Sequence, residues 1–178
     1  MRIHGLQKMT LLDFPGQVAC TVFLGGCDMR CPFCHNSELL NMNAPAFMEE
    51  DELLKFLRSR KGLLDGVAFT GGEPMLRKDL PDFLIKLRQM EYKIKVDTNG
   101  NHPDMLKKIV NEGLADYIAM DVKNSPARYG ATIGLEDFDI TKVDESIAFL
   151  LSGKVDYEFR TTIVREFHTV SDIGEIGR

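Results

Sequence analysis

The chain has 178 residues, of which 44% are hydrophobic, and its 22 basic and 27 acidic side chains give a formal net charge of −5. This length suits a single domain, residues 1–178, with a core of its own, and no apolar run approaches a membrane-spanning helix. The basic residues are spread along the chain, which disfavours a nucleic-acid surface, and there is no secretory signal. We therefore expect a cytoplasmic protein that contacts neither membrane nor nucleic acid.

Residues 1–16 are expected to form an N-terminal extension that ends in a turn at Asp13-Phe14-Pro15-Gly16, because proline and glycine interrupt regular structure. Five predicted strands follow, and the first, residues 18–24, is β-branched and nearly continuous in its apolar character, as expected for a strand buried on both faces of a sheet. The expected strands are 18–24, 66–70, 93–96, 117–120 and 157–164.

Amphipathic segments with helix-capping residues separate these strands. The expected helices are 48–61, a helix capped by Asp79, 104–112 closed by Gly113, and a helix from Val143 to Leu151 that ends near Gly153. A longer loop is expected over residues 124–139, and Ser171 is expected to cap a last helix.

Strands that alternate with helices predict parallel pairing through βαβ crossovers. Five strands are too few to close an eight-stranded barrel. We therefore expect an α/β fold, an open partial (β/α) barrel of about five parallel strands, in which Arg178 is a point of C-terminal truncation.

Three of the four cysteines, Cys27, Cys31 and Cys34, are arranged as C-x3-C-x2-C. This spacing lets three thiolates converge on one side of a loop, which suits an iron-sulfur cluster with one iron left without a protein ligand. A zinc site with His35 as fourth ligand is the alternative, although His35 directly follows Cys34 and its ring seldom reaches the same metal. Cys20 lies inside a strand and is expected to be a buried thiol.

Polar and glycine-rich residues follow the predicted strands directly. In parallel α/β folds ligands bind beyond the carboxyl ends of the strands, so these residues should line one mouth together with the cysteine loop. Arg160 lies within an apolar strand and should pair with a carboxylate, though not with Glu158 beside it. The residues concerned are Gly71-Gly72-Glu73-Pro74, Asp97-Thr98-Asn99-Gly100, Asp121-Val122-Lys123 and Arg160.

The cysteine spacing, with Phe33 before the third cysteine and Gly71-Gly72-Glu73-Pro74 after the second strand, resembles the radical S-adenosylmethionine superfamily. Within it, residues 11–36, with Asp13-Phe14-Pro15-Gly16 and Cys34-His35-Asn36, resemble the activating enzymes of glycyl radical enzymes. The likeness is greatest to the branch that activates anaerobic ribonucleoside-triphosphate reductase.

This resemblance implies one 4Fe-4S cluster on the three cysteines and S-adenosylmethionine bound at the free iron. One electron from the cluster would cleave S-adenosylmethionine to a 5′-deoxyadenosyl radical, which abstracts a Cα hydrogen from a glycine of the partner enzyme. No acid or base is needed, so no side chain is assigned a catalytic role. A flavodoxin or ferredoxin is the implied electron donor.

The resemblance also implies roles for single residues. Gly71, Gly72 and Glu73 would meet the methionine moiety, Phe33 the adenine, and Asn36 a sulfur of the cluster. Asp97, Thr98, Asp121 and Lys123 would hold the ribose, a monovalent cation and the substrate glycine loop, with Asp121 and Lys123 positioning the substrate. Arg160 would pair with the carboxylate of S-adenosylmethionine.

Three alternatives remain at this point. The chain could activate a different glycyl radical enzyme, of the pyruvate formate-lyase type, or act on a small molecule or peptide. It could also be a non-enzymatic metal-binding module. For Asp121 and Lys123 the simpler interpretation is a charge pair at the rim of the sheet.

Overall fold

The computed structural model describes residues 1–177 and contains a six-stranded sheet with the order β2-β3-β5-β6-β7-β8. Five of these strands are parallel, and β2 (Gly5–Thr10) pairs antiparallel with β3 at one edge. The parallel strands are β3 (Ala19–Leu24), β5 (Gly66–Gly71), β6 (Lys93–Thr98), β7 (Tyr117–Asp121) and β8 (Asp156–Arg160). Because β2 and β8 are the two edges of this order, the sheet is open, and the predicted α/β fold without a closed barrel is confirmed.

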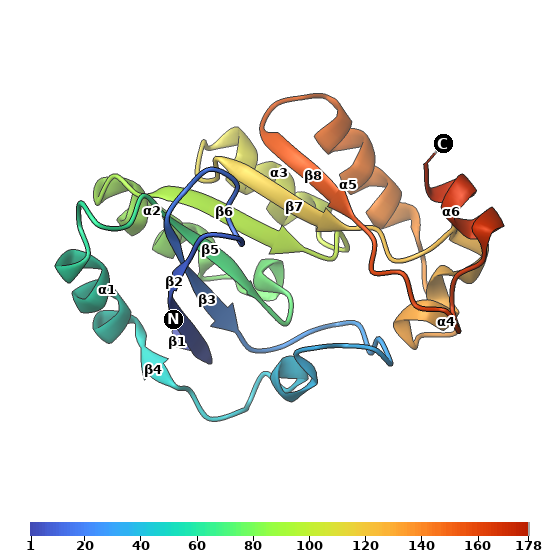
Figure 1. Ribbon diagram of the computed structural model, residues 1–178, viewed down its shortest axis with the longest axis horizontal. Coiled ribbons are helices and arrows are strands. Elements are labelled where there is room, and N and C mark those ends of the chain that lie inside the picture. Colours follow the sequence, from blue (N-terminus) through green and yellow to red (C-terminus); the bar gives the residue numbers. More distant parts are fainter. Residues whose placement is uncertain (178) are drawn as a thin grey trace.

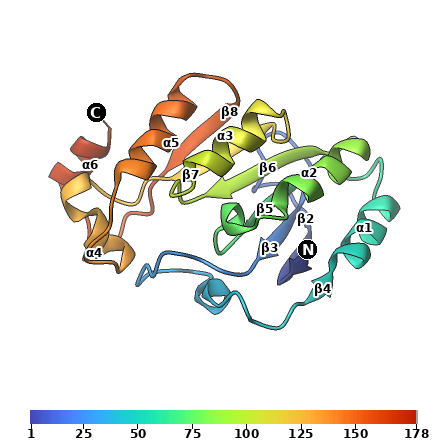
Figure 2. The same ribbon diagram turned by 180° about the vertical axis from the view of Figure 1, so that it is seen from behind.

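Helices cover one face of this sheet, as Figure 2 shows from behind. They are α1 (Glu50–Ser59), α2 (Leu80–Gln89), α3 (Pro103–Asn111) and α5 (Thr141–Leu151). Strand side chains that point toward these helices are apolar and fully buried, for example Val22, Phe69 and Val96. Burial of this apolar face is what holds the layers together.

The opposite face of the strands carries the polar residues of the site. Side chains alternate along a strand, so Lys95 and Asp97 share this face of β6. Strand register adds Asp121 of β7 and Arg160 of β8, which are direct partners across the pair. The helical side of the strands is therefore apolar, whereas the other side combines small apolar residues, such as Ala68 and Ala119, with the charged residues near the strand ends.

The first 16 residues are part of the fold, which corrects the expectation of an extension. Besides β2, the short strand β1 (Arg2–Ile3) pairs with β4 (Met48–Glu49). The loop between β2 and β3 crosses the open face of the sheet in Figure 1 and buries Phe14, which packs on Tyr117 at 6.3 Å between ring centroids. Residues 7–9 of β2 are exposed and lack an apolar alternation, so this edge strand left little pattern to detect.

Two further boundaries differ from the prediction. The expected loop 124–139 contains η3 (Pro126–Arg128) and α4 (Tyr129–Ile133), too short to show a helical period. Strand β8 ends at Arg160 rather than at residue 164. At Val164 the backbone N and O both lie 3.1 Å from Nδ1 of His168.

The last helix, α6 (Val170–Ile176), is capped by Thr169 and not by Ser171. The Thr169 hydroxyl accepts from the backbone of Asp172, and the Asp172 carboxylate accepts from Thr169 in return. The 3-10 turns η1 (Ser37–Leu40) and η2 (Pro74–Leu76) complete the secondary structure. Within residues 1–177 no helix has the length and apolar character needed to cross a membrane.

Candidate functional site

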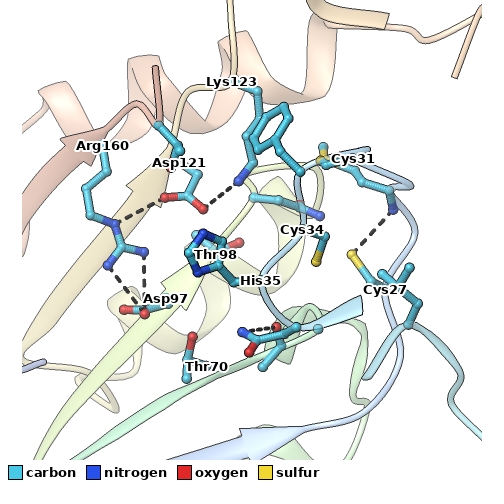
Figure 3. Close-up of a pocket in the computed structure, with 18 residues that line it drawn as sticks. Cys27, Cys31, Cys34, His35, Thr70, Asp97, Thr98, Asp121, Lys123 and Arg160 are labelled. Carbon is cyan, nitrogen blue, oxygen red and sulfur yellow. Dashed lines mark hydrogen bonds and ion pairs between the residues drawn. The ribbon is translucent and has the colours of Figure 1, made fainter. Parts of the chain in front are cut away.

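A pocket of about 330 Å³ opens at the carboxyl ends of the parallel strands. Figure 3 shows the cysteine loop on one side of this pocket and the charged strand ends on the other, with the ring of His35 between them. The structure thus brings together nearly all of the residues that the sequence singled out. Those that line the pocket are Cys27, Cys31, Phe33, Cys34, Asn36, Gly71, Gly72, Asp97, Thr98, Asp121, Lys123 and Arg160.

The cysteine loop is held against the turn after β5 by backbone contacts. The Gly72 amide donates to the Leu24 carbonyl at 2.8 Å, and the Glu73 amide donates to the Gly26 carbonyl at 2.7 Å. A Cβ atom at Gly72 would lie 2.0 Å from the Gly26 oxygen, so a larger residue would push the two loops apart. Gly71 has φ of +117° and equally little room, which explains the glycine pair by packing within the chain.

Glu73 is not among the residues that line the pocket, so its contact with the methionine moiety stays a prediction. Its side chain is buried, and its carboxylate accepts from the Asn99 amide at 2.6 Å, the Met75 amide at 2.9 Å and the Thr98 hydroxyl at 2.9 Å. Burial raises the pKa of Glu73, and these donors oppose that rise. The hydrogen bonds of Glu73 therefore connect the turn after β5 to the turn after β6.

Asp28, between the first two cysteines, makes a second connection to the turn after β6. Its carboxylate accepts from the side-chain amides of Asn99 at 2.8 Å and Asn101 at 2.6 Å, and lies 3.0 Å from Nε2 of His102. Burial alone would raise the pKa of Asp28, but the bonds from His102, Asn101 and Asn99 outweigh it and hold the pKa well below its usual range. The carboxylates of buried Glu73 and half-buried Asp28 thus connect the three loops that build the pocket.

An alternating set of charges forms the strand side of the pocket. Arg160 contacts Asp121 Oδ1 at 3.1 Å and Asp97 Oδ2 at 3.4 Å. Lys123 contacts Asp121 at 2.7 Å, and Lys95 contacts Asp97 at 2.6 Å. Burial would lower the pKa of Lys123, but the Asp121 carboxylate outweighs burial and raises it.

Arg160 pairs with carboxylates of this chain, which partly corrects the expectation drawn from the sequence. Asp97 and Asp121 are its main partners, and Glu158 Oε1 lies at the outer limit of an ion pair, 4.0 Å from a guanidinium nitrogen. Every second residue of a strand points the same way, so Glu158 shares the face of Arg160. A ligand carboxylate would have to share Arg160 with these groups.

Cys27, Cys31 and Cys34 supply the donor set of a 4Fe-4S cluster with one iron left open. Within the described residues, no three His, Cys, Asp or Glu side chains come close enough together to hold a single metal ion. A 4Fe-4S cluster takes one thiolate per iron, so its ligands stand around a larger body. Burial raises the pKa of Cys27 to about 11 and also raises that of Cys31, so metal has to displace a proton from these thiols.

Cys20, Phe33 and Asn36 lie in three different environments. Cys20 is fully buried on the helical face of β3, away from the pocket. Phe33 lies in the pocket wall and packs on Phe167, with 5.6 Å between ring centroids. Asn36 donates to the Gly71 carbonyl at 3.3 Å, which uses one of the two N–H groups of its side-chain amide.

No local sequence pattern pointed to Asp28, Asn101, His102 or Lys95. Asn101 and His102 follow β6 directly, so the rule that ligands bind at the carboxyl ends of parallel strands could have included them. Their partner Asp28 is 73 or 74 residues away in the chain, a contact that no local pattern reveals.

The chain is similar to known proteins over most of its length. The profile of the Radical SAM superfamily matches residues 21–165. A glycyl-radical enzyme activating enzyme of Methanocaldococcus jannaschii is 29% identical over 99% of this chain and 74% of its own length. A pyruvate formate-lyase-activating enzyme of Clostridium pasteurianum is 34% identical over 69% of this chain. An anaerobic ribonucleoside-triphosphate reductase-activating protein of Salmonella typhi is 30% identical over 51% of this chain.

The chain spans 52% of the Clostridium relative and 60% of the Salmonella relative. Among solved structures, SuiB of Streptococcus suis, bound to its precursor peptide, superposes with a TM-score of 0.63 at 17% identity, over 88% of this chain and 35% of that chain. This likeness concerns the fold. Since the superfamily profile matches most of the chain and the three cysteines lie in its pocket, the chain belongs to the radical SAM superfamily.

Proposed function

We propose that this chain activates a glycyl radical enzyme by reductive cleavage of S-adenosylmethionine. The observation that carries the proposal is that the three cysteines share one pocket with the charged ends of β6, β7 and β8. Relatives with this activity in their names match up to 99% of the chain. Membership of the superfamily implies a 4Fe-4S cluster and S-adenosylmethionine.

The cluster would be held by Cys27, Cys31 and Cys34, which leaves one iron open to the pocket. When bound, it would supply the electron that breaks a carbon-sulfur bond of S-adenosylmethionine. The chain itself supplies binding, orientation and exclusion of water, so the expected absence of an acid or base remains part of the proposal.

S-adenosylmethionine would be bound by the strand ends. Arg160 is 37% exposed and is the cation best placed to meet its carboxylate. Backbone carbonyl groups of Gly71 and Gly72 would accept hydrogen bonds from its ammonium group. Phe33 would contact the adenine, and Asp97 with Thr98 would contact the ribose. The carboxylates of Asp97 and Asp121 would hold a monovalent cation, while Asp121 and Lys123 would position the glycine loop of the substrate.

The favoured target is anaerobic ribonucleoside-triphosphate reductase, with a flavodoxin or ferredoxin as electron donor. A pyruvate formate-lyase type of target is the second candidate. The relative that activates that enzyme has the higher identity and matches more of this chain, 34% over 69% against 30% over 51%.

Anaerobic reconstitution with iron and sulfide tests the general proposal. After reduction, the chain should convert S-adenosylmethionine to 5′-deoxyadenosine and methionine. A chain that retains zinc alone, or whose reduced cluster yields no 5′-deoxyadenosine, would support a metal-binding module instead.

Electron paramagnetic resonance then identifies the target. The reduced protein is mixed with anaerobic ribonucleotide reductase or with pyruvate formate-lyase, each beside a variant in which the radical glycine is replaced by alanine. A glycyl radical on the reductase supports the favoured target, and one on the lyase alone supports the second. If 5′-deoxyadenosine forms and neither partner carries a radical, the substrate is a small molecule, a peptide or another enzyme.

A further inference from the structure

Lys95 is a buried cation directly below the pocket. Its side chain is 2% exposed, and its ammonium donates to Asp97 Oδ1 at 2.6 Å. In the strand register it lies between Ala68 of β5 and Tyr117 of β7, on the same face as Asp97. Within the described part of the chain, Asp97 is its one ion-pair partner.

Burying an ammonium group is costly, and a single ion pair seldom repays that cost. Well-packed apolar residues would serve the stability of this sheet at least as well. The position of the pair therefore suggests a use at the pocket, since Asp97 is one of its lining residues.

The two oxygens of Asp97 have different partners. Oδ1 faces Lys95, which is buried, whereas Oδ2 faces Arg160, which is 37% exposed in its side chain. Asp121 is arranged in the same way, with Lys123 on Oδ2 and Arg160 on Oδ1. Each carboxylate thus has one lysine of its own, and Arg160 is shared between them.

This arrangement decides what happens when a ligand carboxylate reaches Arg160. If Arg160 were the only cation beside Asp97, its departure would leave a carboxylate unpaired in a partly buried site. With Lys95 in place, Asp97 stays paired, and Arg160 can turn to the ligand.

We propose that Lys95 is a positioning residue for the binding of S-adenosylmethionine: it keeps Asp97 paired from below and so releases Arg160 for the carboxylate of the ligand. The inference rests on the proposed function, because it takes S-adenosylmethionine as the ligand of the pocket. The Lys95 ammonium would thus be a cation of the chain itself, in contrast to a monovalent cation bound from solution.

The test measures equilibrium binding of S-adenosylmethionine to the reconstituted, oxidised protein, which needs neither reduction nor a partner enzyme. Lys95→Met should bind about tenfold more weakly, because Asp97 then retains Arg160; tenfold corresponds to about 1.4 kcal/mol. Lys93→Met, at the exposed start of the same strand, is the matched control and should bind as the wild type does. Far-UV circular dichroism and thermal unfolding of the cluster-free chain show whether each variant folds.

A second variant separates this role from a general loss of structure. Asp97→Asn combined with Lys95→Met removes both charges, so the competitor for Arg160 is gone. Compared with Asp97→Asn alone, the double variant should bind within about twofold, whatever Asp97→Asn itself costs at the ribose, whereas independent effects would add a further tenfold loss. The amide oxygen that Asp97→Asn introduces can still accept from Lys95, so the single variant leaves no ammonium in the core without a partner.

The outcomes are distinct. Binding by Lys95→Met within about twofold of the wild type, or a double variant that binds about tenfold more weakly than Asp97→Asn alone, would overturn the inference. If the wild type itself does not bind S-adenosylmethionine, the proposed function fails instead. A Lys95→Met chain that does not fold would show that Lys95 is needed for the sheet itself and would also overturn it.

Discussion

Glu73 is buried between two of the loops that build the pocket. Its carboxylate is enclosed by three donors, two of them backbone amides of different loops. Replacement by glutamine keeps the shape but turns an NH2 group toward an N–H donor at one of these positions, because only one oxygen remains.

We expect Glu73→Gln to lower the free energy of unfolding by about 1–3 kcal/mol, the usual cost of a buried donor left without an acceptor. Urea denaturation of the cluster-free chain measures this. Glu112→Gln, at an exposed position after α3, should change stability little. Equal stability of the two variants would mean that the Glu73 network contributes nothing to the fold.

The cysteines allow a second test at the residue scale. Cys27→Ala, Cys31→Ala and Cys34→Ala should each lose most of the iron and sulfide taken up on reconstitution, because three thiolates are the full protein ligand set of the proposed cluster. Cys20→Ala should retain them, since Cys20 is buried on the other face of β3. Loss of iron in Cys20→Ala with retention in one of the others would require a different ligand set.

Among the elements, α6 is connected to the loop before η3 through the buried carboxylate of Asp172. Asp172 accepts from the Thr169 hydroxyl at 2.6 Å, from the Thr169 amide at 2.8 Å and from the Ser125 hydroxyl at 2.8 Å. The Thr169 hydroxyl and amide, followed by Ser125, lower the pKa of Asp172 from 3.8 to about 2. Ser125 lies just before η3, so its hydrogen bond to Asp172 connects α6 to the loop that carries Lys123.

A lowered pKa gives the folded state a preference for the ionised carboxylate. The stabilisation is fully present above pH 3.8 and is lost as pH falls from there toward about 2. We therefore expect Asp172→Asn to be less stable than the wild type at pH 6, with a difference that shrinks as pH falls from 4 toward 2.

Urea denaturation across this pH range provides the measurement. Glu175→Gln, at an exposed position of the same helix, is the control and should follow the wild type at every pH. A difference between Asp172→Asn and the wild type that stays constant down to the lowest pH would show that the charge of Asp172 does not stabilise α6.

At the scale of the whole molecule, the pocket depends on how closely three loops approach one another. Gly72 is where the turn after β5 meets the cysteine loop, with no room for a Cβ beside the Gly26 carbonyl. Any side chain there must displace backbone, and Cys27 directly follows Gly26.

Gly72→Ala should therefore keep the sheet and its helices but take up far less iron than the wild type, because the cysteines shift relative to the strand ends. Iron content and far-UV circular dichroism measure the two effects separately. Gly174→Ala, in α6 with open space around it, should take up iron normally. Full iron uptake by Gly72→Ala would show that the cysteine loop adapts to a wider spacing.

Local sequence patterns were sufficient to predict the five parallel strands, apart from the end of β8, and most of the polar residues of the pocket. These follow from local patterns: apolar runs mark strands, glycine and polar residues mark their ends, and parallel strands bring those ends to one edge. Cys27, Cys31 and Cys34 needed only their spacing to be recognised.

The tertiary structure alone decided which polar groups face the ligand and which are used within the chain. The carboxylates of Glu73 and Asp28 contact residues 25 to 74 positions away in the chain. Lys95 is buried and contacts Asp97, which lines the pocket. Burial and hydrogen bonding between distant segments leave no periodic trace in a sequence, because they depend on where strands and loops meet in space. The three cysteines were visible in the sequence, whereas the charges opposite them took their roles only from the fold.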